Sequence, residues 1–319
     1  MRNDKNRKGN GKENVFLERN DTGMRFRRVR EYWNKPEHAA YLFIAPAGIL
    51  LFVFCILPLI SSFVISLLKM GVDFRMAEFV GIENYRKAFG DRQFRNSFWV
   101  TVKYSLIETP LQMFVGIALS ALIARNSFFN RLVRSIYFLP VITSAVTVGI
   151  MWQMLLHSNV GLFTYWIQRS GLGKVNLLNN PGTALYTIIA ISIWRSFGIS
   201  TIILVAAIQN VSKDYFEAAQ LDGAGSVRQF FAITLPEIMP SVWFLVMTRI
   251  IGSLQVFDII YTLTNGGPNK STNTMVLYIY QEAFTKNHNM GYATAVSEIL
   301  FLLILVIIML QQYVMKKTL

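Results

Sequence analysis

Cysteine and histidine are scarce in this sequence, with one Cys and three His among 319 residues. The lone Cys55 cannot form a disulfide within the chain. His38, His157 and His288 lie far apart and do not form a Cys/His spacing of the kind that binds zinc. We therefore expect no metal site, and we interpret each histidine as a polar residue at a membrane interface.

Several motifs of catalytic and nucleotide-binding sites are also missing. The sequence has no G-x-x-x-x-G-K-[ST] loop, so we do not expect the chain to bind ATP through such a phosphate loop. It has neither a serine elbow nor a His-Glu-x-x-His pair. A membrane-embedded enzyme would need clustered histidines or carboxylates, which the sequence lacks. We predict that the chain is not an enzyme and needs no cofactor of its own.

Charged residues make up only 15% of the chain, whereas 53% of its residues are hydrophobic and its mean hydropathy is +0.39. Several apolar windows exceed the ~20 residues that cross a bilayer. The net charge of +13 is better explained by basic flanks at a membrane surface than by binding to nucleic acid. The composition therefore predicts an integral membrane protein.

The apolar runs divide the chain into two parts. Residues 1–37 are polar and basic, and we expect a disordered cytoplasmic tail there. Residues 38–319 are expected to form an all-α transmembrane domain with six helical spans. Prolines inside these runs are interpreted as kinks, with Pro140 bending the third span. The expected spans are residues 40–68, 97–124, 135–156, 183–208, 241–262 and 293–314.

An even number of spans places both termini on one side of the membrane. The basic tail predicts that this side is the cytoplasm. The short loop bearing Arg125, Arg131 and Arg134 agrees with this orientation. The segment 69–96 does not agree, because it is also basic and would lie outside.

A polar stretch at residues 211–240 separates the fourth and fifth apolar runs. Ser212 is a good N-cap for a first helix, which a glycine turn would end. A capping box that starts at Ser226 predicts a second short helix, with its end at Pro236 and Pro240. We predict a helix–turn–helix at the membrane surface.

This layout resembles the EAA loop of ABC importer permeases, in which Glu-Ala-Ala is followed by Asp-Gly-Ala and then by Ile-x-Leu-Pro. Both the spacing and the position between the fourth and fifth spans agree. A plain amphipathic helix with a glycine turn is the alternative. The matching residues are Glu217, Ala218, Ala219, Asp222, Gly223, Ala224, Ile233, Leu235 and Pro236.

A second resemblance narrows the family. The stretch Leu263-Thr264-Asn265-Gly266-Gly267-Pro268 is similar to a loop of permeases for sugars and related solutes. The resemblance implies a permease subunit that forms half of the pathway for a carbohydrate, with residues 211–240 as a cytoplasmic coupling loop. The solute could be a disaccharide, an oligosaccharide or a glycerol-phosphate-type compound.

The same resemblance implies partners and a location. The expected partners are a second homologous permease, two ATPase subunits that bind ATP and Mg, an extracytoplasmic solute-binding protein and membrane lipid, but no nucleic acid. The location would be a bacterial or archaeal plasma membrane. The alternative is an ion-coupled secondary transporter, for which Glu108, Asp258 and Glu298 are the candidate carboxylates.

Polar residues at membrane depth are costly and are therefore candidates for the solute pathway. In the resembled family, the spans flanking the EAA loop line a central cavity. Trp194 and Phe197 could offer ring faces to a sugar or pack between helices, and Arg195 could instead form a buried pair with Asp258. The pathway candidates are Trp194, Arg195, Ser196, Phe197, Arg249, Ser253, Gln255 and Asp258.

Overall fold

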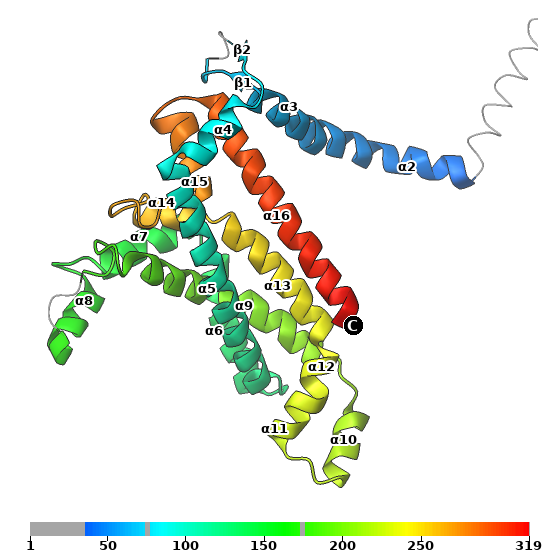
Figure 1. Ribbon diagram of the computed structural model, residues 1–319. Coiled ribbons are helices and arrows are strands. Elements are labelled where there is room, and N and C mark those ends of the chain that lie inside the picture. The colour runs from blue at the N-terminus through cyan, green and yellow to red at the C-terminus, as the bar shows by residue number, and fades with distance from the viewer. Residues whose placement is uncertain (1–35, 74–76, 173–175, 319) are drawn as a thin grey trace, which may run out of the picture. The chain divides into compact units, whose positions relative to one another are not determined.

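The computed structural model describes residues 36–73, 77–172 and 176–318 (Figure 1). These residues fall into two units, one ending at Ser62 and the other beginning at Phe63, and each is described by itself. Helices dominate both units. Within the described ranges, the strands are β1 (Leu68–Lys69) and β2 (Glu78–Phe79), which pair antiparallel. The predicted all-α class is confirmed.

The first unit is one long helix with a widened turn. Helix α2 (Pro36–Leu51) runs through the π-turn η1 (Phe52–Ile56) into α3 (Leu57–Ser66), which ends in the second unit. Pro58 has no N–H to donate, and in the turn before it Leu57 N–H donates five residues back, to Phe52 O. The apolar part of this helix is long enough to cross a membrane.

The second unit contains the remaining helices, and Figure 1 shows their arrangement. In chain order they are α4 (Glu83–Gly90), α5 (Arg92–Ile123), α6 (Phe128–Ile142), α7 (Ala145–Leu155), α8 (Leu162–Ile167), η2 (Gln168–Leu172), α9 (Ala184–Gln209), α10 (Lys213–Leu221), α11 (Ser226–Gln229), η3 (Phe230–Thr234), α12 (Leu235–Glu237), α13 (Met239–Leu254), α14 (Asp258–Leu263), α15 (Met275–Tyr280), η4 (Gln281–Thr285) and α16 (Met290–Thr318).

Four described helices are long and apolar enough to cross a membrane, and the number rises to six if two bent pairs each count as one span. In the first pair, α6 and α7 meet at 96°. The predicted bend at Pro140 is wrong, because Pro140 lies inside α6 and the break falls at Thr143, whose backbone is extended. In the second pair, α11–α12 meets α13 at 67°.

The predicted fifth span is also interrupted near its far end. Helix α13 stops at Leu254, and a new helix, α14, starts at Asp258. Gln255 and Asp258 therefore do not share one helix.

Close contacts between backbones hold α5, α6 and α9 together. Gly116 of α5 faces Ser200 of α9, where an added Cβ would lie 3.1 Å from the serine Cβ. Gly198 of α9 lies against α6, and an added Cβ there would stand 2.2 Å from Tyr137 O. Both glycines permit an approach that a side chain would prevent.

The second unit has two distinct ends. At one end, Gln209 Nε2 of α9 donates to Ala124 O after α5, and Gln311 Nε2 of α16 donates to Trp243 O of α13. The segment α10–α12, which we call the hairpin, connects α9 to α13 at this end, which we call the hairpin end (Figure 1).

Asp91 organises the opposite end. Its carboxylate caps α5 by accepting from Gln93 N–H at 2.7 Å, and it also accepts from the hydroxyls of Tyr278 at 2.6 Å and Tyr292 at 3.0 Å. Burial alone would raise the pKa of Asp91, but these hydrogen bonds outweigh it, so the pKa lies below its ordinary value. The carboxylate thus ties together α5, α15 and α16.

Candidate functional site

A polar cavity of about 260 Å³ lies between α5, α7, α9, α13 and the start of α14. Helix α9 supplies candidates from the predicted fourth span. Helix α13 and the break that follows it supply candidates from the predicted fifth span. The cavity brings together six of the eight predicted pathway residues: Arg195, Ser196, Arg249, Ser253, Gln255 and Asp258.

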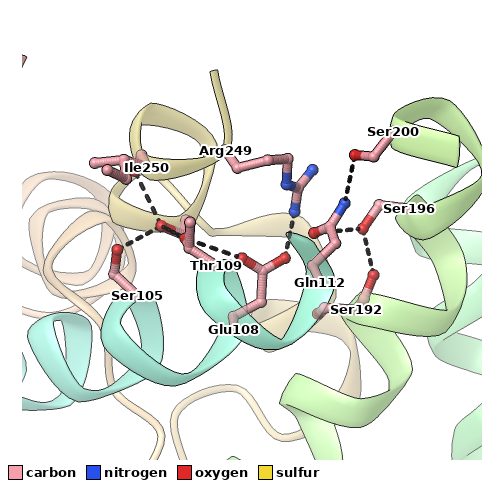
Figure 2. Close-up of polar contacts among 10 residues, drawn as sticks. Ser105, Glu108, Thr109, Gln112, Ser192, Ser196, Ser200, Arg249 and Ile250 are labelled. Atoms are coloured by element: carbon pink, nitrogen blue, oxygen red, sulfur yellow. Dashed lines mark hydrogen bonds and ion pairs between the residues drawn. The ribbon is translucent and has the colours of Figure 1, made fainter. Parts of the chain in front are cut away.

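Arg249 and Glu108 form an ion pair between α13 and α5 (Figure 2). The Glu108 side chain is fully buried, whereas the Arg249 side chain is 24% exposed. Such a carboxylate needs a partner, because an isolated buried charge is strongly unfavourable. The alternative in which Arg195 pairs with Asp258 is not observed among the described residues. Both line the cavity, but neither makes an ion pair with any residue in the described ranges.

A chain of weak polar contacts joins α5 to α9 beside this pair (Figure 2). Gln112 Nε2 of α5 donates to Ser200 Oγ at 3.5 Å, and Ser196 Oγ donates to Gln112 Oε1 at 3.3 Å. Ser196 Oγ also lies 2.5 Å from the carbonyl oxygen of Ser192. Small hydroxyl residues thus let two spans approach closely, with hydrogen bonds between Gln112 and the hydroxyls of Ser196 and Ser200.

A second set of hydroxyls joins α5 to α13 (Figure 2). Ser105 Oγ and Ser253 Oγ are 2.5 Å apart, and Thr109 Oγ1 donates to Ser253 Oγ at 3.2 Å. All three residues are buried. Ser253 is therefore tied to a neighbouring helix at the edge of the cavity.

The two aromatic candidates lie outside the polar cavity. The Trp194 ring meets the Trp152 ring edge to face at 5.5 Å between centroids, in a separate apolar groove. The Phe197 ring meets Tyr137 of α6 in the same way at 5.2 Å. These contacts favour helix packing over sugar stacking for both side chains.

The sequence interpretation missed the contribution of α5 to the cavity. Tyr104 lines it, and Glu108 and Gln112 hold the flanking helices. These three residues follow one another at intervals of four, which places them on one face of a helix. That polar stripe in an otherwise apolar span was the available signal. Glu108 had been considered only as an ion-coupling carboxylate.

The hairpin is a helix–turn–helix, as predicted. Ser212 caps α10, with its hydroxyl accepting from Asp214 N–H at 3.3 Å. The turn passes through Gly223, whose φ of +76° is strained for other residues. Ala224 N–H then donates to Ala219 O at 2.8 Å, which closes the end of α10.

The second helix of the hairpin departs from the prediction in two ways. Gly225, and not Ser226, is the N-cap of α11, and Gln229 Nε2 donates to Ala224 O at 2.8 Å, so the predicted capping box is not formed. The helix also continues past Pro236 to Glu237, through the π-turn η3. Pro240 lies in the first turn of α13, where a missing N–H costs little.

The hairpin leaves several large apolar side chains uncovered, and Glu217 is exposed as well. Its large apolar side chains are exposed by 52% at Tyr215, 91% at Leu221, 73% at Val227 and 62% at Phe231. A small pocket of about 180 Å³ joins the two halves of the matched motif, with Ala219, Asp222, Ala224 and Ile233 in its wall. Exposed apolar residues on a polar hairpin are typical of a protein-binding surface.

Comparisons with known proteins agree with this architecture. The family described as binding-protein-dependent transport system inner membrane component matches residues 114–319. The trehalose/maltose transport system permease protein MalF of Thermococcus litoralis is 31% identical over 83% of this chain and 89% of its own length. The sulfoquinovosyl glycerol transport system permease protein SmoG of Agrobacterium fabrum is 33% identical over 83% of this chain and 86% of its own.

A solved structure shares the fold. It is a chain of a bacterial ABC transporter involved in the import of the acidic polysaccharide alginate, with a TM-score of 0.80 and 23% identity over 91% of this chain and 99% of that chain. The family match covers well over half of the sequence. The chain is therefore a multi-pass membrane protein that belongs to the family of binding-protein-dependent transport system inner membrane components.

Proposed function

We propose that this chain is the permease subunit of an ATP-driven ABC importer and forms half of the pathway for a sugar or a related carbohydrate. The observation that carries the proposal is a physical connection. The hairpin, with its exposed Glu217 and apolar surface, continues at one end into α9 and at the other into α13. These two helices supply Arg195, Ser196, Arg249 and Ser253 to the polar cavity.

The connection suggests how force reaches the cavity. The chain passes from α9 to α10 through only three residues, and α12 joins α13 at Ile238 with a bend of 67°. A displacement of the hairpin therefore acts directly on both helices. Alternating access by rigid-body movement of packed helices is a known mode of transport.

The proposed partners follow from the surfaces left open. Two ATPase subunits bind ATP and Mg, and one of them receives the hairpin at Glu217 and the surrounding apolar residues. A second, homologous permease forms the other half of the pathway. An extracytoplasmic binding protein delivers the solute. We place the hairpin and both termini in the cytoplasm of a bacterial or archaeal cell, because ATP is available there.

The class of solute is supported by the relatives, whose names specify trehalose or maltose and sulfoquinovosyl glycerol. The cavity agrees with such solutes, because serine hydroxyls and the Gln255 amide suit hydroxyl-rich molecules. The ion-coupled alternative is not favoured. Of its candidates, Glu108 and Glu298 are buried, and Glu108 is already held by Arg249.

Cross-linking tests whether the hairpin meets an ATPase. A Leu221→Cys variant in a Cys55→Ser background is combined with cysteines placed along the surface of the co-encoded ATPase. We expect a bifunctional maleimide to join the two chains. The matched control is Leu106→Cys in the middle of α5, which is 69% exposed and lies outside the hairpin. Equal cross-linking of both sites, or of neither, would contradict the proposal.

A further inference from the structure

We infer that the transported solute carries a negatively charged group, a carboxylate, sulfonate or phosphate, and that Arg195 binds this group in the polar cavity. The inference rests on the proposed function and adds the charge of the solute to it. The observation behind it is that one of the two cavity arginines is neutralised and the other is not.

Arg249 is not available for an anionic solute. Its guanidinium is paired with the fully buried carboxylate of Glu108. Releasing Arg249 would leave Glu108 as an uncompensated buried charge, which is strongly unfavourable. Arg249 is therefore a structural cation of the α5–α13 contact (Figure 2).

Arg195 is in the opposite situation. It is half-buried in α9 and lines the same cavity, and it has no ion pair or side-chain hydrogen bond within the part of the chain that the structure describes. Its Nε is buried without a hydrogen-bond partner, as is the Nε of Arg249, so the difference between the two arginines is the ion pair with Glu108. A guanidinium at this depth is retained at a high cost, so a ligand that neutralises it is strongly favoured.

Asp258 completes the chemistry of the cavity. It begins α14, is exposed and forms no ion pair with a described residue, so its carboxylate can accept hydrogen bonds. Arg195 prefers a planar or tetrahedral oxyanion, which it can bind through two parallel N–H groups. Asp258 and the Gln255 amide suit sugar hydroxyls. An acidic saccharide or polyol satisfies both kinds of group at once.

The test uses the complete assembly in proteoliposomes: this chain, its co-encoded permease, the ATPases and the binding protein. The anionic probes are radiolabelled sn-glycerol-3-phosphate and sulfoquinovosyl glycerol, and the neutral probe is trehalose. ATP-dependent uptake is compared for the wild type, Arg195→Gln, Arg195→Lys and a control, Arg131→Gln, which changes an exposed arginine in the first turns of α6. Binding of each probe to the isolated binding protein is measured in parallel.

We expect the wild type to take up an anionic probe, and Arg195→Gln to reduce that uptake by about 10-fold or more. Arg195→Lys keeps the charge but loses the two parallel N–H groups, so it should retain more uptake than Arg195→Gln and less than the wild type, whereas Arg131→Gln should behave as the wild type. Uptake of trehalose alone would overturn the inference, and so would an equal loss of anionic and neutral uptake in Arg195→Gln. The latter result would indicate that Arg195 pairs with a carboxylate of the second permease.

A different result would count against the proposed function itself. If no probe enters in an ATP-dependent manner and no loaded binding protein stimulates ATP hydrolysis, the chain is not the importer subunit proposed above. The inference would then fall with that function. Transport of neutral solutes only would leave the proposed function intact and overturn the inference alone.

Discussion

Glu108 of α5 and Arg249 of α13 form an ion pair beside the polar cavity, 141 residues apart in the sequence. The pair links α13, the helix that follows the hairpin, to α5. The polar face of α5 was missed by the sequence interpretation. It also explains why two arginines can line one cavity. Arg249 stabilises the contact between α5 and α13, whereas Arg195 is available to bind the solute.

The pair predicts an asymmetry between single and double substitutions. Arg249→Gln leaves Glu108 buried and unpaired, and we expect it to lower the free energy of unfolding by about 3–5 kcal/mol. Adding Glu108→Gln removes the unpaired charge and should restore much of this loss. Thermal unfolding of the purified assembly in lipid nanodiscs measures the difference. A double variant that is less stable than the single variant would contradict the pairing.

Asp91 predicts a dependence of stability on pH. Its folded-state pKa lies below the ordinary value of about 3.9, so its contribution is fully present above that pH and is lost as the pH falls through the folded-state pKa. Replacing it by Ala removes the cap of α5 and two tyrosine hydrogen bonds, at a cost of about 0.5–2 kcal/mol from the cap alone. The difference in unfolding temperature between wild type and Asp91→Ala should be largest at pH 7 and shrink as the pH falls through the folded-state pKa of Asp91. A constant difference would exclude the carboxylate as the cause.

Gly198 predicts a severe steric effect at the α9–α6 contact. A Cβ at this position would lie 2.2 Å from Tyr137 O, which is part of the backbone and cannot rotate away. We expect Gly198→Ala to force the helices apart and to reduce the yield of folded assembly in the membrane. Gly48→Ala in α2 is the matched control, because no atom lies within 4 Å of its added Cβ. Equal yields for both variants would show that the two helices can separate without harm.

The sequence was most informative where a motif or a long apolar run sets the structure. The bounds of α10 and the glycine turn at Gly223 follow from local rules of capping and backbone conformation, and both were confirmed. The break after Leu254 could not be predicted, because nothing in the apolar pattern marks it. Partner choice among distant charges also depends on tertiary packing. The sequence left open whether Arg195 pairs with Asp258 or faces the pathway, and it did not indicate the pairing of Arg249 with Glu108.

The cavity residues show the same limit in a different form. The position of the two spans beside the EAA-type loop indicated the correct helix segments, since six of the eight candidates line one cavity. The rotation of α9 about its axis decides which of its side chains reach the cavity. Trp194 and Phe197 instead contact Trp152 and Tyr137 on neighbouring helices. Such a rotation is set by packing, which composition alone does not specify.

The central claim is that the hairpin couples ATP hydrolysis to transport, and the Gly223 turn offers the most direct test. Gly223 and Gly225 both have open space around an added Cβ, but only Gly223 needs a positive φ, of +76°. Gly223→Val therefore strains the turn by about 1–3 kcal/mol and should displace Glu217, whereas Gly225→Val is the matched control.

The measurement is the number of solute molecules imported per ATP hydrolysed by the reconstituted assembly. We expect this ratio to fall sharply in Gly223→Val and in Glu217→Ala, with the variants still assembled and the binding protein still loaded. Gly225→Val should keep the wild-type ratio. An unchanged ratio in both Gly223→Val and Glu217→Ala, in correctly assembled complexes, would contradict the role of the hairpin in coupling.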